Sequence, residues 1–363
     1  MQPLIGRNRW VVIREGERLR WGGDLRRHHI FSALAERTEA TVVDRWTNAT
    51  LVAATRGPRW KRVLRPIRAL PRLASAEQLP VKMIPYAERF ADPVAVAIYD
   101  DAAAQLRAFG MTVDPDRMRQ DREKRVLNEA LFRWHVVPTA SFAELAGLDD
   151  RRVIVGGNAT NAAHVQPQPW PAIPAIGVVS GAAPGRGLEA LIDAARLVRE
   201  AVPDVRLLLW LMATSPQSEA YLDDLRRSVS GEPWIEIGAV GYDDLGTALG
   251  RASVLCIAHP ANDYMDVALP VKLFDSMAAG RPLVVTPRRE TRAIVERHGA
   301  GIVTAGDRPE DLADGIARLL GDEALARRLG AAARLAAETV YDWPIVADRI
   351  ADEVLRREGF AGR

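Results

Sequence analysis

A lysine and an aspartate three residues apart indicate a site for a charged, hydroxylated ligand. Lys272 and Asp275 lie in segment 269–286, which has the pattern of a turn, an amphipathic helix, a glycine stop and a buried strand. Residues three apart share one helix face, so both side chains should lie near the amino terminus of this helix, where anions bind. The lysine would add charge for a phosphate, and the carboxylate would accept hydrogen bonds from sugar hydroxyls. The alternative is a solvated ion pair on an exposed helix.

The neighbouring residues predict where this helix begins and ends. Pro270 suits a first helical turn, where its missing N–H is not needed. Gly280 stands where the residue just past the end of a helix is expected. Arg281 and Pro282 then prevent the helix from continuing. The short strand 283–286 follows.

A second strand and loop of this kind lies upstream. Residues 175–181 form a mainly apolar run that ends in a turn at Ser180 and Gly181. The sequence Pro-Gly-Arg-Gly then leads from residue 184 into a helix whose apolar residues recur at helical spacing. This is the strand–turn–helix pattern of a parallel α/β sheet.

These segments resemble the C-terminal half of GT-B glycosyltransferases, especially family 4. Those enzymes hold the ribose and diphosphate of a nucleotide sugar with a carboxylate-bearing helix followed by Ala-x-Gly-x-Pro-Val-Val. The resemblance spans about residues 172–345. It departs from the family at Val267, where a first glutamate is usual. Pro270, Lys272 and Asp275 are similar to a variant found in some cell-surface polysaccharide enzymes.

The resemblance implies an α/β fold of the GT-B type, with two Rossmann-like domains, each a doubly wound parallel sheet, facing a central cleft. It implies transfer of a sugar from a nucleoside diphosphate sugar to an acceptor hydroxyl, with retention of configuration and without a metal cofactor. The acceptor stays open between a glycan, a lipid-linked molecule and a small molecule. The residues that it implies for donor binding are Gly22, Gly23, Ser180, Gly181, Arg186, Gly238, Val240, Pro270, Val271, Lys272 and Asp275.

Two aspartates at a predicted strand end are candidates for catalysis. Asp100 and Asp101 follow the apolar run 94–99, and the resemblance implies an acid or a histidine near this point, beside the reacting sugar. Either carboxylate could polarise the acceptor hydroxyl or stabilise positive charge at the anomeric carbon. The alternative is that they cap the helix that follows, since aspartate is a favoured N-cap residue.

Strand-like and helix-like segments alternate through both halves of the chain, as in parallel α/β sheets. The Pro-rich segment 165–174 has the composition of a semi-rigid linker. We therefore predict an N-terminal acceptor-side domain (1–164), this linker, a nucleotide-sugar domain (175–343) and a final helix (344–363) that packs back toward the N-terminal domain. Strands are expected near 10–13, 40–43, 94–99, 134–138, 152–155, 176–180, 206–211, 234–237, 253–257, 283–286 and 301–303.

Composition and charge narrow the class of protein. The 363 residues are 48% hydrophobic and 26% charged, with a net charge of +2 and one cysteine, which fits a two-domain α/β protein of a reducing compartment. The chain shows no signal-peptide core and no apolar run near the ~20 residues of a membrane span. We therefore expect a cytoplasmic location.

A basic segment indicates a peripheral contact with the inner face of a membrane. Residues 56–72 interleave seven cations with apolar side chains and contain no acidic residue. This pattern favours an anionic lipid surface as partner, and a solvated loop is the alternative. No nucleic-acid-binding motif accompanies the segment, so nucleic acid is not an expected partner.

The remaining charged residues give no metal site. No cluster of His, Cys and carboxylates has metal-site spacing, and Asp114 and Asp116, which flank a proline, are interpreted as a helix start. Arg288 and Arg289 are interpreted as exposed loop arginines, and the alternative is contact with the donor phosphate or an anionic acceptor. Two rival functions stay open: a nucleotide-sugar epimerase on the same fold, and a non-catalytic scaffold, which Val267 favours.

Overall fold

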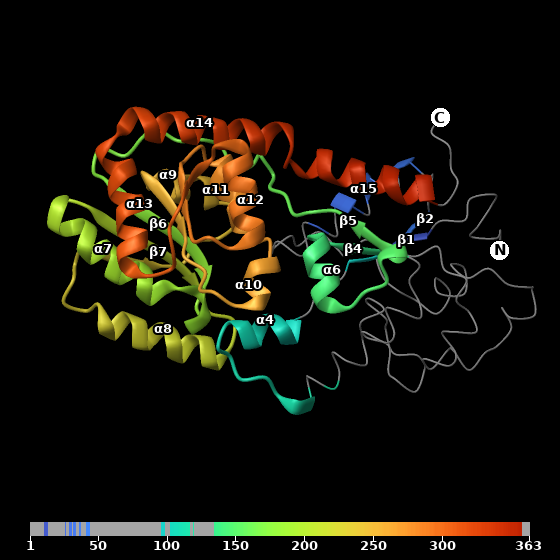
Figure 1. Ribbon diagram of the computed structural model, residues 1–363, viewed down its shortest axis with the longest axis horizontal. Coiled ribbons are helices and arrows are strands. Elements are labelled where there is room, and N and C mark those ends of the chain that lie inside the picture. Colours follow the sequence, from blue (N-terminus) through green and yellow to red (C-terminus); the bar gives the residue numbers. More distant parts are fainter. Residues whose placement is uncertain are drawn as a thin grey trace, which may run out of the picture. The chain divides into compact units, whose positions relative to one another are not determined.

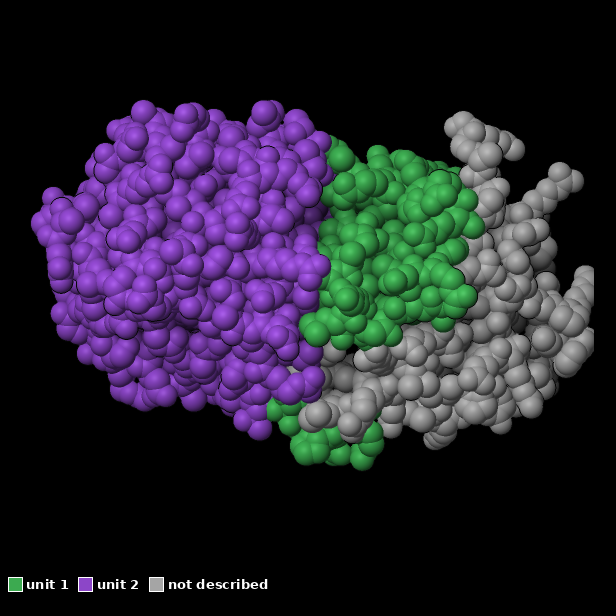
Figure 2. Space-filling view, in the orientation of Figure 1, with its two compact units in different colours: residues 1–103, 113–157, 344–363 green, residues 104–112, 158–343 purple. Residues whose placement is uncertain are grey.

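The computed structural model describes residues 11–13, 26, 29–30, 32–33, 36–37, 41–43, 96–98, 102–116, 119 and 134–357. The chain divides into two compact units, shown in different colours in Figure 2. The first unit comprises residues 1–103, 113–157 and 344–363, and the second comprises residues 104–112 and 158–343. The boundary after residue 157 lies before the Pro-rich segment, which belongs to the second unit.

The second unit is built on six parallel strands (Figure 1). These are β6 (Ala175–Gly181), β7 (Arg206–Met212), β8 (Ile235–Gly238), β9 (Val254–Ile257), β10 (Leu283–Val285) and β11 (Gly301–Val303). Their order across the sheet is β11-β10-β9-β6-β7-β8. The winding direction therefore reverses between β6 and β9, and in open α/β sheets ligands bind beyond the carboxyl ends of the strands at such a switch point.

Helices cover both faces of this sheet. Core residues of α7 (Leu188–Ala201), α8 (Pro216–Ser228) and α13 (Pro309–Gly321) pack on one face. Those of α9 (Leu245–Gly250), α11 (Val271–Ala278), α12 (Arg289–His298) and α14 (Glu323–Thr339) pack on the other. The strands serve both cores because successive side chains point to opposite faces. In β7, Leu207, Leu209 and Leu211 enter the first core, and Leu208 and Trp210 the second.

Two glycines fix the ends of helices that border the switch point. Gly280 has φ +68° just past α11, which confirms its predicted place as a helix stop. Gly187 has φ +71° and is the N-cap of α7. A Cβ on Gly187 would overlap the carbonyl oxygen of Ala258, the residue after β9. Only glycine meets both conditions, so the start of α7 lies directly against the loop that follows β9.

The Pro-rich segment 165–174 is held against the second unit by two arginines. Arg281, 1% exposed, donates to the carbonyl oxygens of Gln168 (2.9 Å) and Pro169 (2.7 Å). Arg334 donates to that of Val165 at 2.7 Å. Proline has no backbone N–H, so a proline-rich segment supplies few donors for its own carbonyl groups, and these guanidinium groups satisfy them instead. The segment is thus tied to the second unit at Val165, Gln168 and Pro169, and its composition alone did not indicate this.

The first unit also contains parallel strands. β1 (Val11–Ile13) pairs with β2 (Thr41–Val43), and β3 (Val96–Ile98), β4 (Trp134–Val137) and β5 (Val153–Val155) form a second sheet in that order. Its described helices include α6 (Ala140–Ala146) and residues 344–357 of α15 (Trp343–Arg357). Together with the second unit, these strands confirm the predicted α/β class.

The terminal helix α15 is tied to other parts of the first unit by ion pairs and hydrogen bonds. Arg37 contacts Asp348 at 2.7 Å and Asp352 at 2.9 Å. Arg349 donates to the carbonyl oxygen of Gly156 at 3.1 Å. The last helix of the chain therefore completes the unit to which the first residues belong.

Candidate functional site

The loops beyond β6 and β9 and the start of α11 bring together several of the predicted donor-binding residues. Lys272, in the first turn of α11, donates from Nζ to Ser180 Oγ at 3.2 Å. Pro270 is the N-cap of this helix, one residue outside the first turn in which it was expected, and Val271 begins it. Gly181 ends β6, and a Cβ on it would lie 3.6 Å from the guanidinium group of Arg186.

Arg186 and Lys272 are half-buried cations without a carboxylate partner among the described residues. Burial lowers the pKa of Arg186 to about 10. Its guanidinium lies 3.5 Å from the centre of the Phe109 ring, a cation–π contact that holds it without neutralising it. Burial beside Arg186 lowers the pKa of Lys272 well below its usual range. Two such cations at a switch point are suited to an anion.

Asp275 does not pair with Lys272, so the alternative of a solvated ion pair is wrong. Its carboxylate is half-buried and accepts a hydrogen bond from Thr160 Oγ1 at 2.8 Å. Burial raises the pKa of Asp275 to about 7, because the charged form is poorly solvated there. A carboxylate with one engaged oxygen can still accept hydrogen bonds from ligand hydroxyls.

An aromatic pair lies near this carboxylate. Tyr242 stacks on His164 with ring centres 4.3 Å apart and an interplanar angle of 8°. The His164 Nε2 lies 2.9 Å from the carbonyl oxygen of Tyr242, within hydrogen-bond distance. Burial and the charge of Asp275 raise the pKa of Tyr242 to about 12. Of the predicted site residues near it, Gly238 ends β8, and Val240 lies with Tyr242 in the loop that follows this strand.

Sequence reasoning missed Thr160, His164, Tyr242 and His259. A signal existed for Tyr242 and His259, because both follow strands of the parallel sheet at its carboxyl edge. No local signal existed for Thr160, which contacts Asp275 from 115 residues away.

Arg288 corrects the expectation of two exposed loop arginines. Its side chain is 9% exposed and lies 3.5 Å from Asp266 and 3.9 Å from Asp307. Arg289 is 64% exposed, as expected, but it is the first residue of α12 rather than part of a loop. Arg288 differs because two carboxylates from other segments offset its charge and permit burial.

Several predicted residues lie outside the described part of the chain. These are Gly22, Gly23, Asp100, Asp101 and the basic segment 56–72. Among the described residues, no group of three His, Cys, Asp or Glu side chains could hold a metal ion. Asp114 Oδ1 accepts from the backbone N–H of Asp116 at 2.8 Å, which agrees with its interpretation as a helix start.

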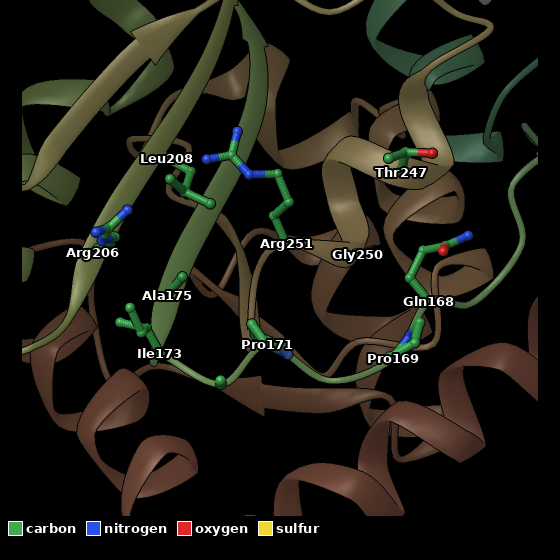
Figure 3. A pocket seen from close by; sticks show the side chains of 11 residues that line it. Gln168, Pro169, Pro171, Ile173, Ala175, Arg206, Leu208, Thr247, Gly250 and Arg251 are labelled. Atoms are coloured by element: carbon green, nitrogen blue, oxygen red, sulfur yellow. The ribbon is translucent and has the colours of Figure 1, made fainter.

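A separate pocket lies at the opposite edge of the same sheet (Figure 3). It has a volume of about 420 Å³, and its lining includes Ala175 and Arg206, the first residues of β6 and β7. Pro169 and Pro171 border it from the Pro-rich segment. The amino ends of the strands are not where ligands bind in such sheets, so this pocket is distinct from the candidate site.

Residues 173–322 match the family described as glycosyl transferases group 1. Among curated proteins, the phosphatidyl-myo-inositol mannosyltransferase of Mycobacterium leprae is 31% identical over 171 residues, covering 46% of this chain and 42% of that protein.

A second relative carries a related name. It is the GDP-mannose-dependent monoacylated alpha-(1-6)-phosphatidylinositol monomannoside mannosyltransferase of Corynebacterium glutamicum. This protein is 27% identical over 184 residues, which cover 49% of this chain and 46% of that protein. The matched part of the chain thus spans less than half the length of these two relatives.

A solved structure extends the likeness over nearly the whole chain. The Anabaena protein Alr3699/HepE, crystallised in complex with UDP and glucose, has a TM-score of 0.62 and 16% identity over 95% of this chain and 98% of that chain. At this identity the likeness shows the fold. The GT-B class predicted from the sequence is therefore confirmed.

Proposed function

We propose that the chain is a glycosyltransferase that moves a sugar from a nucleoside diphosphate sugar to an acceptor hydroxyl in glycolipid or polysaccharide synthesis. The observation that carries this proposal is the pair of half-buried, uncompensated cations, Arg186 and Lys272, at the switch point of the second unit. They would neutralise the leaving diphosphate, while Asp275 accepts hydrogen bonds from ribose or sugar hydroxyls. The matched family and the names of both mannosyltransferase relatives support the same activity.

Thermal stabilisation by nucleotides tests this function directly. UDP and GDP should raise the melting temperature, since a ligand that binds only the folded state stabilises it. UMP and GMP, which lack the second phosphate, should raise it much less. Equal shifts with monophosphates and diphosphates, or no shift with any nucleotide, would contradict the proposed donor site. Diphosphate binding without transfer to any glycan or lipid acceptor would favour the non-catalytic scaffold instead.

Transfer is proposed to retain the anomeric configuration and to need no divalent metal. Arg186 and Lys272 supply two positive charges where the diphosphate would lie, so its developing charge is already balanced. Activity in excess EDTA should therefore equal that of untreated protein. Activity that EDTA removes, and that only Mg²⁺ or Mn²⁺ restores, would contradict this expectation.

The acceptor is proposed to be lipid-linked, with segment 56–72 bringing the enzyme to an anionic membrane. Within the described residues, no helix has the length and apolar character needed to cross a bilayer. Each of the seven cations in the segment would contribute about 1 kcal/mol near such a surface. The protein should therefore float with anionic liposomes at low salt, less so at high salt, and not with neutral liposomes.

The control for this flotation is a variant in which Arg62, Arg65 and Arg68 are replaced by glutamine. If this variant still floats with anionic liposomes, the protein attaches through another of its surfaces. A protein that floats with neither kind of liposome would favour a soluble acceptor.

A further inference from the structure

His259 is a buried histidine at the switch point. It follows β9, the strand at which the winding direction reverses, and its side chain is 1% exposed. The carbonyl oxygen of His259 accepts a hydrogen bond from Thr286 Oγ1 at 2.7 Å, which fixes the main chain. Nδ1 and Nε2 of its ring are both buried, and neither has a hydrogen-bond partner among the described residues. Buried polar groups without a partner are rare and destabilising, so each one needs an explanation.

Among the described residues, the charged groups that shift the pKa of this ring are all cations. Burial, together with the charges of Lys272, Arg186 and Arg288, lowers the pKa of His259 well below its usual range. The ring is therefore neutral and carries one N–H donor. Arg288 is offset by Asp266 and Asp307, whereas Arg186 and Lys272 have no such carboxylate among the described residues. An anion that reaches these two cations comes close to an imidazole with a free donor.

The amino terminus of α7 lies against the same loop. This helix has 14 residues, and its N-cap Gly187 offers no side chain to the N–H groups of the first turn. Gly187 touches the carbonyl oxygen of Ala258, the residue next to His259. The amino terminus of α7, the two cations and the unpartnered imidazole thus all lie at the carboxyl edge of the sheet near the switch point, and each of them favours an anion.

We propose that His259 donates a hydrogen bond to a phosphoryl oxygen of the bound nucleoside diphosphate, beside Arg186, Lys272 and the amino terminus of α7. This proposal rests on the proposed function and adds a third side chain to the phosphate site. During transfer the bond between the anomeric carbon and the phosphate oxygen breaks, and its electron pair stays on that oxygen. The acceptor hydroxyl oxygen forms the new bond to the anomeric carbon, and its proton passes to the leaving phosphate or to solvent. A neutral N–H donor beside this oxygen stabilises the negative charge that develops on it as the diphosphate leaves. Because the donor is neutral, it does not cancel the charge of the bound diphosphate before the reaction.

Substitutions of His259 separate this role from a structural one. His259→Leu should bind UDP and GDP about tenfold more weakly in titration calorimetry, since hydrogen bonds to charged groups have effects of this size. His259→Gln, which keeps an N–H donor of similar reach, should stay within about threefold of the wild type. The shorter His259→Asn should lose affinity as His259→Leu does. Inorganic phosphate tests whether a free phosphate alone is held in the same way.

The stability of the empty protein gives an independent readout. Removing an unpartnered buried donor should not destabilise the fold, so the melting temperature of ligand-free His259→Leu should equal or exceed that of the wild type. A ring needed only for packing would instead lower the melting temperature in all three variants and leave affinity unchanged. His298→Leu removes a half-buried histidine that contacts Tyr341, and serves as the matched control for affinity.

The outcomes distinguish the inference from the proposed function. If the wild type binds UDP or GDP, Lys272→Ala weakens that binding and His259→Leu does not, then the inference is wrong and the proposed function stands. If His259→Leu does not fold, the comparison of His259→Gln with His259→Asn decides, and equal affinities in the two overturn the inference. If the wild type binds no nucleoside diphosphate, both are wrong.

Discussion

Replacing Lys272 by alanine is expected to weaken the binding of a nucleoside diphosphate by about 1–3 kcal/mol, the scale of a charge-assisted contact. Nζ of Lys272 is already placed by Ser180 Oγ at 3.2 Å, so the contact needs little reorganisation. The same substitution should make the empty protein more stable at neutral pH. Burial lowers the pKa of Lys272, so the folded state binds its proton less tightly than the unfolded chain does, and this opposes folding until the pH exceeds the unfolded pKa.

Titration calorimetry with UDP and GDP measures the first effect, and thermal unfolding measures the second. Arg318→Ala is the matched control, because it removes one positive charge from an exposed position on α13. Arg186→Ala should weaken binding as Lys272→Ala does. Unchanged affinity in both Arg186→Ala and Lys272→Ala would show that the diphosphate binds elsewhere.

The fold of the second unit could be predicted from the sequence because its strands carry strong local signals. Residues 207–211 of β7 are all apolar, and the structure buries them alternately in two cores. Gly280 could be placed because a positive φ at a helix end favours glycine. The Pro-rich segment could not be placed in this way. Its partners Arg281 and Arg334 lie more than 100 residues away in the sequence, and composition carries no information about them.

The site was predictable in the parts that coincide with helix starts. Arg186 and Lys272 stand where a turn leads into a helix, and this local pattern is visible in the sequence. Their surroundings were not visible, because Ser180 meets Lys272 across 92 residues. Arg288 was misjudged for the same reason, since its burial depends on Asp266 and Asp307 from other segments. Spacing therefore identified candidate residues, and tertiary contacts decided how each one is charged and paired.

Replacing Asp275 by asparagine is expected to remove a pH-dependent loss of stability. Burial raises the pKa of Asp275 to about 7 from its ordinary value of 3.8, so the folded state holds this proton more tightly than the unfolded chain does. Its contribution to stability is present below the unfolded pKa and is lost as the pH rises through about 7. Asp275→Asn should therefore match the wild type near pH 4 and be more stable by roughly 2–4 kcal/mol at pH 8.

Urea unfolding at pH 4, 6 and 8 measures this difference. Asp314→Asn, on the exposed side of α13, is the matched control and should follow the wild type at every pH. Thr160 can still donate its hydrogen bond to the amide oxygen of the asparagine, so the local contact should survive. Identical pH profiles for the wild type and Asp275→Asn would mean that this carboxyl is not buried as described.

The same substitution should lower activity while it raises stability. In asparagine the oxygen that Thr160 contacts remains, but the second carboxylate oxygen becomes an NH2 donor, so the ribose or sugar hydroxyls lose that charged acceptor. We expect kcat/KM for the donor to fall roughly 10- to 100-fold, the effect of one or two lost charge-assisted hydrogen bonds. Donor affinity in the wild type should rise between pH 6 and 8 as Asp275 ionises, and this rise should be absent in Asp275→Asn. A carboxylate kept at the expense of stability, and needed in its charged form for the donor, is what a binding role for Asp275 requires.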